Sequence, residues 1–208
     1  MLKYSREIFV MTIKYVRVNK GDNMKQINRI HIVGASGSGT TTLASELSKV
    51  AGYKHLDTDN YFWEDTDPKF QEKRPVEKRL RLLNDEFKKY DRWILSGSLC
   101  GWGDVLIPKF DLVIFLKLPQ NVRLERLLRR EKERYGDEIE KGNSWYENHL
   151  VFMDWAAQYD NGDENVRSLE LHNKWLKTVK CDVLRIEEVM EIQDKLELVL
   201  NYIDRNES

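Results

Sequence analysis

One glycine-rich segment constrains the fold of this 208-residue chain more than any other feature: residues 34–41 read GASGSGTT. The β-branched run RIHIV at 29–33 precedes it, and residues 40–51 follow with apolar side chains at helical spacing. A strand, a glycine-rich turn and a helix in this order aim backbone N–H groups and a helix N-terminus at one anion. The segment therefore predicts a phosphate-binding turn in an α/β protein.

The spacing agrees with the phosphate-loop pattern G-x-x-x-x-G-K-[ST] at every place except one, where Thr40 replaces the lysine. Thr41 is placed to offer its hydroxyl to Mg²⁺, and a merely structural turn is the alternative interpretation. The residues expected to bind phosphate are Gly34, Ser36, Gly37, Ser38, Gly39, Thr40 and Thr41.

The missing lysine makes the source of positive charge an open question. Two unit charges about 4 Å apart interact by about 4 kcal/mol at an effective dielectric of about 20, so losing one costs rate unless another cation compensates. Arg123, Arg126, Arg130 and Arg134 recur at spacings of three, four and four, which puts them on one face of a helix at 121–135. Either these arginines hold an external anion, or they form an ordinary solvated face and Thr40 marks a nucleotide-binding protein with little turnover.

Two carboxylates follow the second expected strand, at Asp57 and Asp59. Ligands of open parallel sheets bind beyond the carboxyl ends of the strands. Carboxylates there can orient Mg²⁺-bound water or accept a proton from a substrate hydroxyl. The alternative is that both residues only cap a loop.

Strands and helices alternate along the chain, which predicts a three-layer α/β fold with a parallel sheet. The expected strands are 29–33, 53–56, 93–95, 112–118 and 183–186, and the expected helices are 40–51, 75–90, 121–135, 145–159, 164–179 and 189–203.

Composition excludes some classes of function. Lys plus Arg number 34 and Asp plus Glu 35, a net charge of −1, whereas a nucleic-acid-binding protein usually has a basic excess. No apolar run approaches the ~20 residues that cross a membrane. Two cysteines make no disulfide framework, so a cytoplasmic location is expected.

The first 23 residues have two open interpretations. Residues 20–23, KGDN, precede Met24 and are compatible with codons that contain a bacterial ribosome-binding sequence. Residues 1–23 are then either a translated leader or a genuine N-terminal strand or flexible extension. In both cases we expect residues 24–208 to form one domain.

Residues 30–186 resemble the adenylate-kinase-like small-molecule kinases of the P-loop superfamily, which include nucleoside-monophosphate, shikimate and gluconate kinases. The resemblance implies a five-stranded parallel sheet of order 2-3-1-4-5 with helices on both faces and a small lid at about 134–147. It also implies that Arg123, Arg126 and Arg130 act on the phosphates and that Asp57 or Asp59 contacts the acceptor.

The segment after the second strand is also similar to bacterial P-loop proteins described as topology-modulation or AAA proteins. The shared residues are His55, Leu56, Asp57, Tyr61 and Trp63.

Together these features predict an ATP- or GTP-dependent kinase that uses Mg²⁺ and phosphorylates a small-molecule acceptor. A nucleotide-binding regulatory protein with little or no turnover is the alternative.

Overall fold

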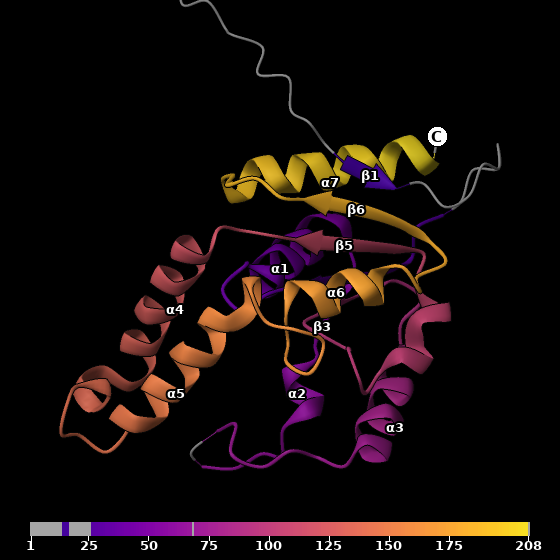
Figure 1. Cartoon of the computed structure of the whole chain (residues 1–208). Helices are drawn as coiled ribbons and strands as arrows, with labels where there is room; N and C mark the ends of the chain where they lie inside the picture. The colour runs from indigo at the N-terminus through magenta and orange to yellow at the C-terminus, as the bar shows by residue number, and fades with distance from the viewer. Residues whose placement is uncertain (1–13, 17–25, 68, 208) are drawn as a thin grey trace, which may run out of the picture.

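The computed structural model describes residues 14–16, 26–67 and 69–207. A six-stranded sheet lies between its helices (Figure 1). The strands lie in the order β1-β6-β5-β2-β4-β3. Their bounds are β1 Lys14–Val16, β2 Arg29–Gly34, β3 Lys54–Asp57, β4 Trp93–Ser96, β5 Leu112–Leu116 and β6 Asp182–Ile186.

The strands β2 to β6 are parallel to one another, and the most central of them is β2, which pairs with β4 and β5. Counted from β2, their order is 2-3-1-4-5, so the expected sheet is confirmed. The sheet also has an antiparallel edge, where β1 pairs with β6 and Lys14 lies opposite Arg185. The rest of residues 1–23 lies outside the described residues, so the leader interpretation stays a prediction.

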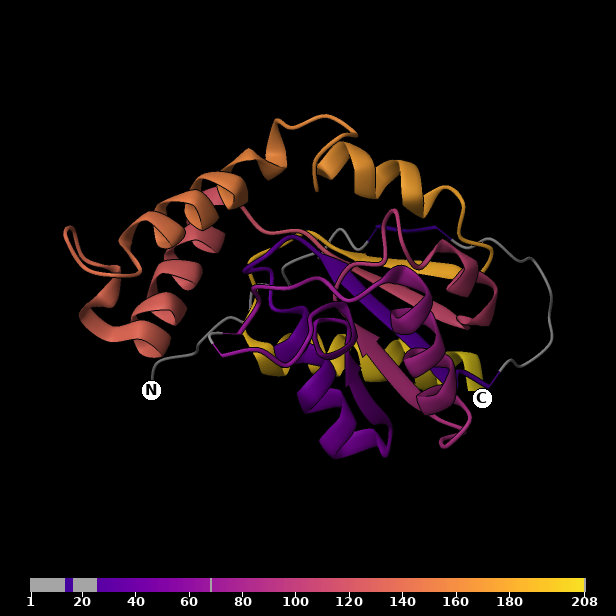
Figure 2. The ribbon, with the colours of Figure 1, turned by 90° about the horizontal axis from the view of Figure 1, so that it is seen from below.

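Helices cover both faces of the sheet, as Figure 2 shows. Alternate side chains of β2 divide between the two faces: Val33 joins a cluster with Leu83 and Trp175, whereas Ile32 joins a cluster with Leu43. This alternation follows from the two-residue period of a strand, and it buries both faces. The helices are α1 Thr40–Ala51 and α7 Ile192–Glu207 on one face, and α3 Val76–Phe87 and α6 Leu169–Leu176 on the other.

The helix expected at 164–179 is half that length in the structure. Asp163 instead accepts the backbone N–H of Asn165 in a turn, and the Ser168 hydroxyl accepts the N–H of Leu171 as an N-cap. Side chains of this kind favour turns and caps over helix interiors, so α6 begins only at Leu169.

Two helices and the turn between them project from the sheet as an arm (Figures 1 and 2). They are α4 Gln120–Tyr135 and α5 Tyr146–Ala157. Residues 134–147, the expected lid, form the tip of this arm, and their closure over a ligand stays a prediction. The remaining short elements are α2 Asp59–Phe62 and the 3₁₀ turns Asp104–Lys109, Gly136–Ile139 and Gln158–Asp160.

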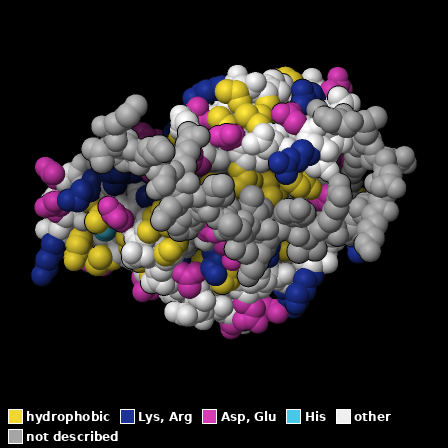
Figure 3. All heavy atoms as spheres, turned by 90° about the horizontal axis from the view of Figure 1, so that it is seen from above, with side chains coloured by type: hydrophobic (Ala, Val, Ile, Leu, Met, Phe, Trp, Pro, Cys, Tyr) yellow, Lys and Arg dark blue, Asp and Glu magenta, His cyan; other side chains and the backbone are white. Residues whose placement is uncertain are grey.

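Acidic and basic side chains are interspersed on the face seen in Figure 3, in keeping with the balanced composition. Among the described residues, no helix is both long enough and apolar enough to cross a bilayer.

Candidate functional site

The glycine-rich segment forms a tight turn between β2 and α1, which begins at Thr40. Gly37 has a φ of 81°, and a Cβ atom there would lie 2.6 Å from the carbonyl oxygen of Arg123 in α4. Only glycine accepts both this backbone angle and this close approach at low cost. The turn is thereby held directly against the arm, and α1 directs its N-terminus into the space between them.

The end of β3 is joined to the start of α1 by side-chain hydrogen bonds. The Thr41 hydroxyl donates to Asp57 Oδ2 over 2.8 Å, and the Ser96 hydroxyl donates to the same oxygen over 3.1 Å. Asp57 Oδ1 accepts the backbone N–H of Asp59 at 3.0 Å. These three hydrogen bonds fix the carboxylate of Asp57. His55 Nε2 in turn lies 2.9 Å from Ser96 Oγ.

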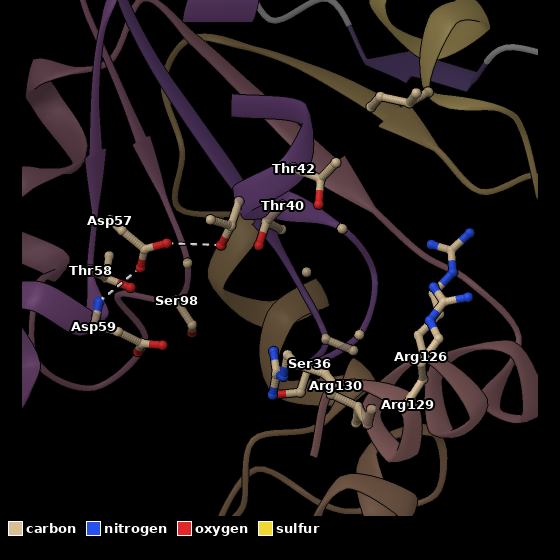
Figure 4. A pocket seen from close by; sticks show the side chains of 18 of the residues that line it. Ser36, Thr40, Thr42, Asp57, Thr58, Asp59, Ser98, Arg126, Arg129 and Arg130 are labelled. Atoms are coloured by element: carbon tan, nitrogen blue, oxygen red, sulfur yellow. Dashed lines mark hydrogen bonds between the residues drawn. The ribbon is translucent and has the colours of Figure 1, made fainter. Parts of the chain in front are cut away.

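Thr41, Asp57 and Asp59 line a pocket of about 470 Å³ between the glycine-rich turn, the arm and the start of α7. Figure 4 shows Arg130 beside Ser36, with Asp59 on the opposite wall. Of the predicted site residues, Ser38 and Arg123 do not line the pocket, and the others do: Gly34, Ser36, Gly37, Gly39, Thr40, Thr41, Asp57, Asp59, Arg126 and Arg130.

The Arg123 guanidinium lies behind the pocket and is fully buried. It forms a 2.8 Å ion pair with Asp160 and donates to the carbonyl oxygens of Ser36 and Ala156. It also lies 4.9 Å from the centre of the Tyr159 ring. Its partners are therefore groups of the protein, and it positions the glycine-rich turn against the arm instead of facing a ligand.

Arg134, the last of the four regularly spaced arginines, lies over the ring of Phe70 at 5.0 Å. The four arginines therefore lie in three environments. Arg126 and Arg130 line the pocket, Arg123 is buried in the interior, and Arg134 lies at the tip of the arm.

The pocket is lined by three cations that were not among the predicted site residues, Arg129, Arg167 and Lys195. Arg167 precedes α6, and Lys195 lies in the first turn of α7. Neither residue stands in a recognisable motif. The only signal in the sequence was position, because Arg167 lies just before the start of α6 and Lys195 lies at the start of α7.

Asp59 is close enough to Arg167 and Arg130 for their charges to affect its pKa. Desolvation, followed by the neighbouring carboxylate of Asp57, raises the pKa of Asp59, while Arg167 and Arg130 oppose that rise. Burial lowers the pKa of Arg167, and Asp59 counteracts that effect. The site therefore holds a carboxylate that takes a proton more readily than usual, beside a cation.

A chain of buried polar groups links the acidic wall of the pocket to the arm. Ser98 lines the pocket, and its hydroxyl lies 3.2 Å from His172 Nε2. The other ring nitrogen of His172 lies 2.7 Å from the hydroxyl of Tyr159, which Arg123 covers. Burial lowers the pKa of His172 to about 3, so the imidazole is neutral at pH 7.

The donor set fits Mg²⁺ bound to a nucleotide. Thr41 and Asp57 offer a hydroxyl and a carboxylate within 2.8 Å of each other, and Mg²⁺ prefers one or two such oxygens together with substrate phosphates. Among the described residues, no group of three His, Cys, Asp or Glu side chains is arranged to hold a metal by itself.

Residues 30–149 match the protein family described as "AAA domain". The chain belongs to this family of P-loop proteins. Within the AAA domain family it is similar to the uncharacterized protein YqaC of Bacillus subtilis (strain 168), with 48% identity over 85% of this chain and 98% of that protein. The expected resemblance to P-loop small-molecule kinases is also confirmed.

Two further comparisons relate this AAA domain to kinases. A cytidylate kinase of Pyrococcus abyssi is 31% identical over 49% of this chain and 60% of that protein. The solved shikimate kinase of Acinetobacter baumannii, in complex with shikimate, has the same fold, with a TM-score of 0.54 and 17% identity over 86% of this chain and 94% of that one. The chain therefore has the fold of a nucleotide-binding, kinase-like protein.

Proposed function

We propose that this protein is a Mg²⁺-dependent kinase that transfers the γ-phosphoryl group of ATP or GTP to a small-molecule acceptor. The main support for this proposal is that three features line one pocket: the phosphate loop, the Thr41–Asp57 pair, and Asp59 with Arg130 and Arg167. The relative named as cytidylate kinase supports the same class of reaction.

The nucleotide binds on the side of the glycine-rich turn. Its phosphates accept hydrogen bonds from backbone N–H groups of residues 34–41, and the N-terminal partial charge of α1 adds to the attraction. Thr41 and Asp57 hold the Mg²⁺, which neutralises charge on the phosphates when bound. Arg126 lies close to this turn, since a Cβ atom on Gly39 would be 3.8 Å from its guanidinium.

The acceptor binds on the side of Asp59. In the transfer, an acceptor oxygen forms a bond to the γ-phosphorus while the bond from that phosphorus to the bridging oxygen breaks, and the nucleoside diphosphate leaves with the electron pair. For a hydroxyl acceptor, Asp59 takes the proton, and its raised pKa favours that role. Arg130 and Arg126 stabilise the negative charge of the transferring group.

Release of nucleoside diphosphate, measured with a panel of small hydroxyl, carboxyl and phosphate acceptors, tests the proposal. Asp59→Asn is expected to lower turnover by about 10²–10⁴-fold, the usual contribution of a general base, and to leave Mg-ATP binding unchanged. Asp91→Asn, on the exposed turn before β4, is the matched control and is expected to have no effect. Equal turnover in Asp59→Asn and the control would contradict the assigned role.

Thr40 favours one competing function, a nucleotide-dependent regulator with little turnover. The residue lines the pocket where the common loop pattern has lysine, so the loop itself supplies no cation. The same assay separates the two functions, because a regulator binds Mg-nucleotide but releases no additional diphosphate with any acceptor.

A further inference from the structure

The question that Thr40 raises is which cation meets the nucleotide phosphates in place of the loop lysine. Two residues from different helices stand together at the α7 side of the pocket. Arg126 comes from α4 and Lys195 from α7, and both line the pocket with Thr40 and Thr42.

Lys195 is unusual for a lysine because only 5% of its surface is exposed. Lysine is almost never buried to this extent without a partner. Among the described residues, its ammonium group has no hydrogen-bond or ion-pair partner within the ordinary distance limits, although its backbone N–H continues the helix by donating to Glu191. An ammonium group without a protein partner, carried to a pocket by an otherwise buried side chain, is suited to a ligand of opposite charge.

The charges near Lys195 support an anionic ligand. Burial lowers its pKa most, Arg126 lowers it further, and Glu191 opposes the change. Arg126 lowers the pKa of Lys195 because two like charges repel each other in the free protein. A bound phosphate relieves this repulsion, so the binding energy of the anion is larger than either cation alone would give.

The position of the pair indicates which anion it meets. Arg126 reaches the glycine-rich turn near Gly39, where α1 begins, and Figure 4 shows its side chain directed toward the α7 side of the pocket. Asp59, in contrast, lies on the far wall of the pocket with Ser98. The pair is thus on the nucleotide side of the site and away from the acceptor side.

We propose that Lys195 binds the phosphate chain of the nucleotide together with Arg126, and that it supplies from α7 the positive charge that Thr40 does not supply from the loop. This inference rests on the proposed nucleotide-binding function of the same pocket. It assigns to the last helix a phosphate-binding role that the glycine-rich motif itself lacks.

The test compares Lys195→Met with Lys180→Met. Methionine keeps the length and apolar stem of lysine, and Lys180 is an exposed cation before β6 that does not line the pocket, so both variants lose one positive charge. Dissociation constants are measured by calorimetry for Mg-ATP, ADP, AMP and adenosine. We expect Lys195→Met to weaken Mg-ATP binding by about tenfold or more, which is 1.4 kcal/mol, and to leave adenosine binding unchanged.

A second variant tests the replacement of the loop lysine directly. Adding Thr40→Lys to Lys195→Met is expected to recover most of the lost Mg-ATP affinity, because the charge returns to the same phosphates from the other side. If Lys195→Met does not fold, Lys195→Gln, which keeps a polar end, and Lys195→Arg, which keeps the charge, give the same comparison. Unliganded thermal unfolding confirms that each variant is folded.

The outcomes are distinct. Equal affinities for Mg-ATP in Lys195→Met and Lys180→Met overturn the inference and leave the proposed function intact. An equal loss for adenosine and Mg-ATP places Lys195 against the nucleoside instead of the phosphates and also overturns it. A wild-type protein that binds no nucleotide at all overturns the proposed function itself.

Discussion

Arg123 offers the sharpest test of how the site is held together, since its guanidinium is fully buried and joins the glycine-rich turn to the arm. Arg123→Met keeps the apolar stem and removes the charge. Asp160 then loses a 2.8 Å partner, and the carbonyl oxygens of Ser36 and Ala156 lose a donor. Breaking a buried ion pair from one side costs about 3–5 kcal/mol.

The Asp160 side chain keeps 24% of its surface exposed, so water compensates it in part, and we expect about 3 kcal/mol. For a domain of this size about 1 kcal/mol moves the melting temperature by about 2–4 °C, so the expected decrease is roughly 6–12 °C by calorimetry. Arg129→Met is the control, because its pair with Glu133 is exposed and spans 3.9 Å, and such pairs contribute about 0–1 kcal/mol.

A second measurement separates the ion pair from the packing of Arg123. In a double-mutant cycle, Arg123→Met should cost much less when Asp160 is already Asn, because the uncompensated charge is gone. If Arg123→Met lowers the melting temperature no more than Arg129→Met, the buried pair does not hold the turn against the arm, and the reasoning is refuted.

Three further predictions address other parts of the structure. Gly97→Ala should lower the free energy of unfolding by about 1–3 kcal/mol in a denaturant titration, since a Cβ atom there would collide with the side chain of Thr58; a wild-type midpoint would contradict this. Thr41→Ala should weaken Mg-ATP binding in calorimetry without changing adenosine binding, and unchanged Mg-ATP affinity would exclude its contact with the bound metal. Burial lowers the pKa of His31 from its ordinary 6.5 to about 4, so the unfolded chain takes up the proton first and stability should fall as the pH drops from 6.5 to 4. His31→Phe should flatten that part of the stability profile, and an unchanged slope would show that His31 does not cause it.

The five parallel strands of the sheet were predictable because each of them carries its own local signal. The run at 112–116 is continuously apolar, as a strand buried on both faces must be, and its boundaries differ little from the expected ones. The phosphate loop was equally local, since its glycines stand at fixed spacing between a strand and a helix. Asp57 was predicted because it ends a strand at the carboxyl end of the sheet, where ligands of parallel sheets bind.

The rest of the site depends on contacts that spacing does not encode. Helical periodicity grouped Arg123 with Arg126, but whether a guanidinium faces a pocket or an interior carboxylate is decided by Asp160, which lies 37 residues away. Arg167 and Lys195 reach the pocket only through tertiary packing. Composition also did not indicate that Ser168 would shorten α6, because caps compete with helix propensity residue by residue.

The antiparallel pairing of β1 has a consequence for solubility. In the structure, Lys14–Val16 covers the outer side of β6, so the backbone of residues 183–185 lies between two neighbouring strands. A chain that began at Met24 would lack this cover, and β6 would become an open sheet edge. Unpaired N–H and C=O groups on such an edge are a template for strands of other molecules. Removing the first 23 residues is therefore expected to promote self-association through the sheet edge.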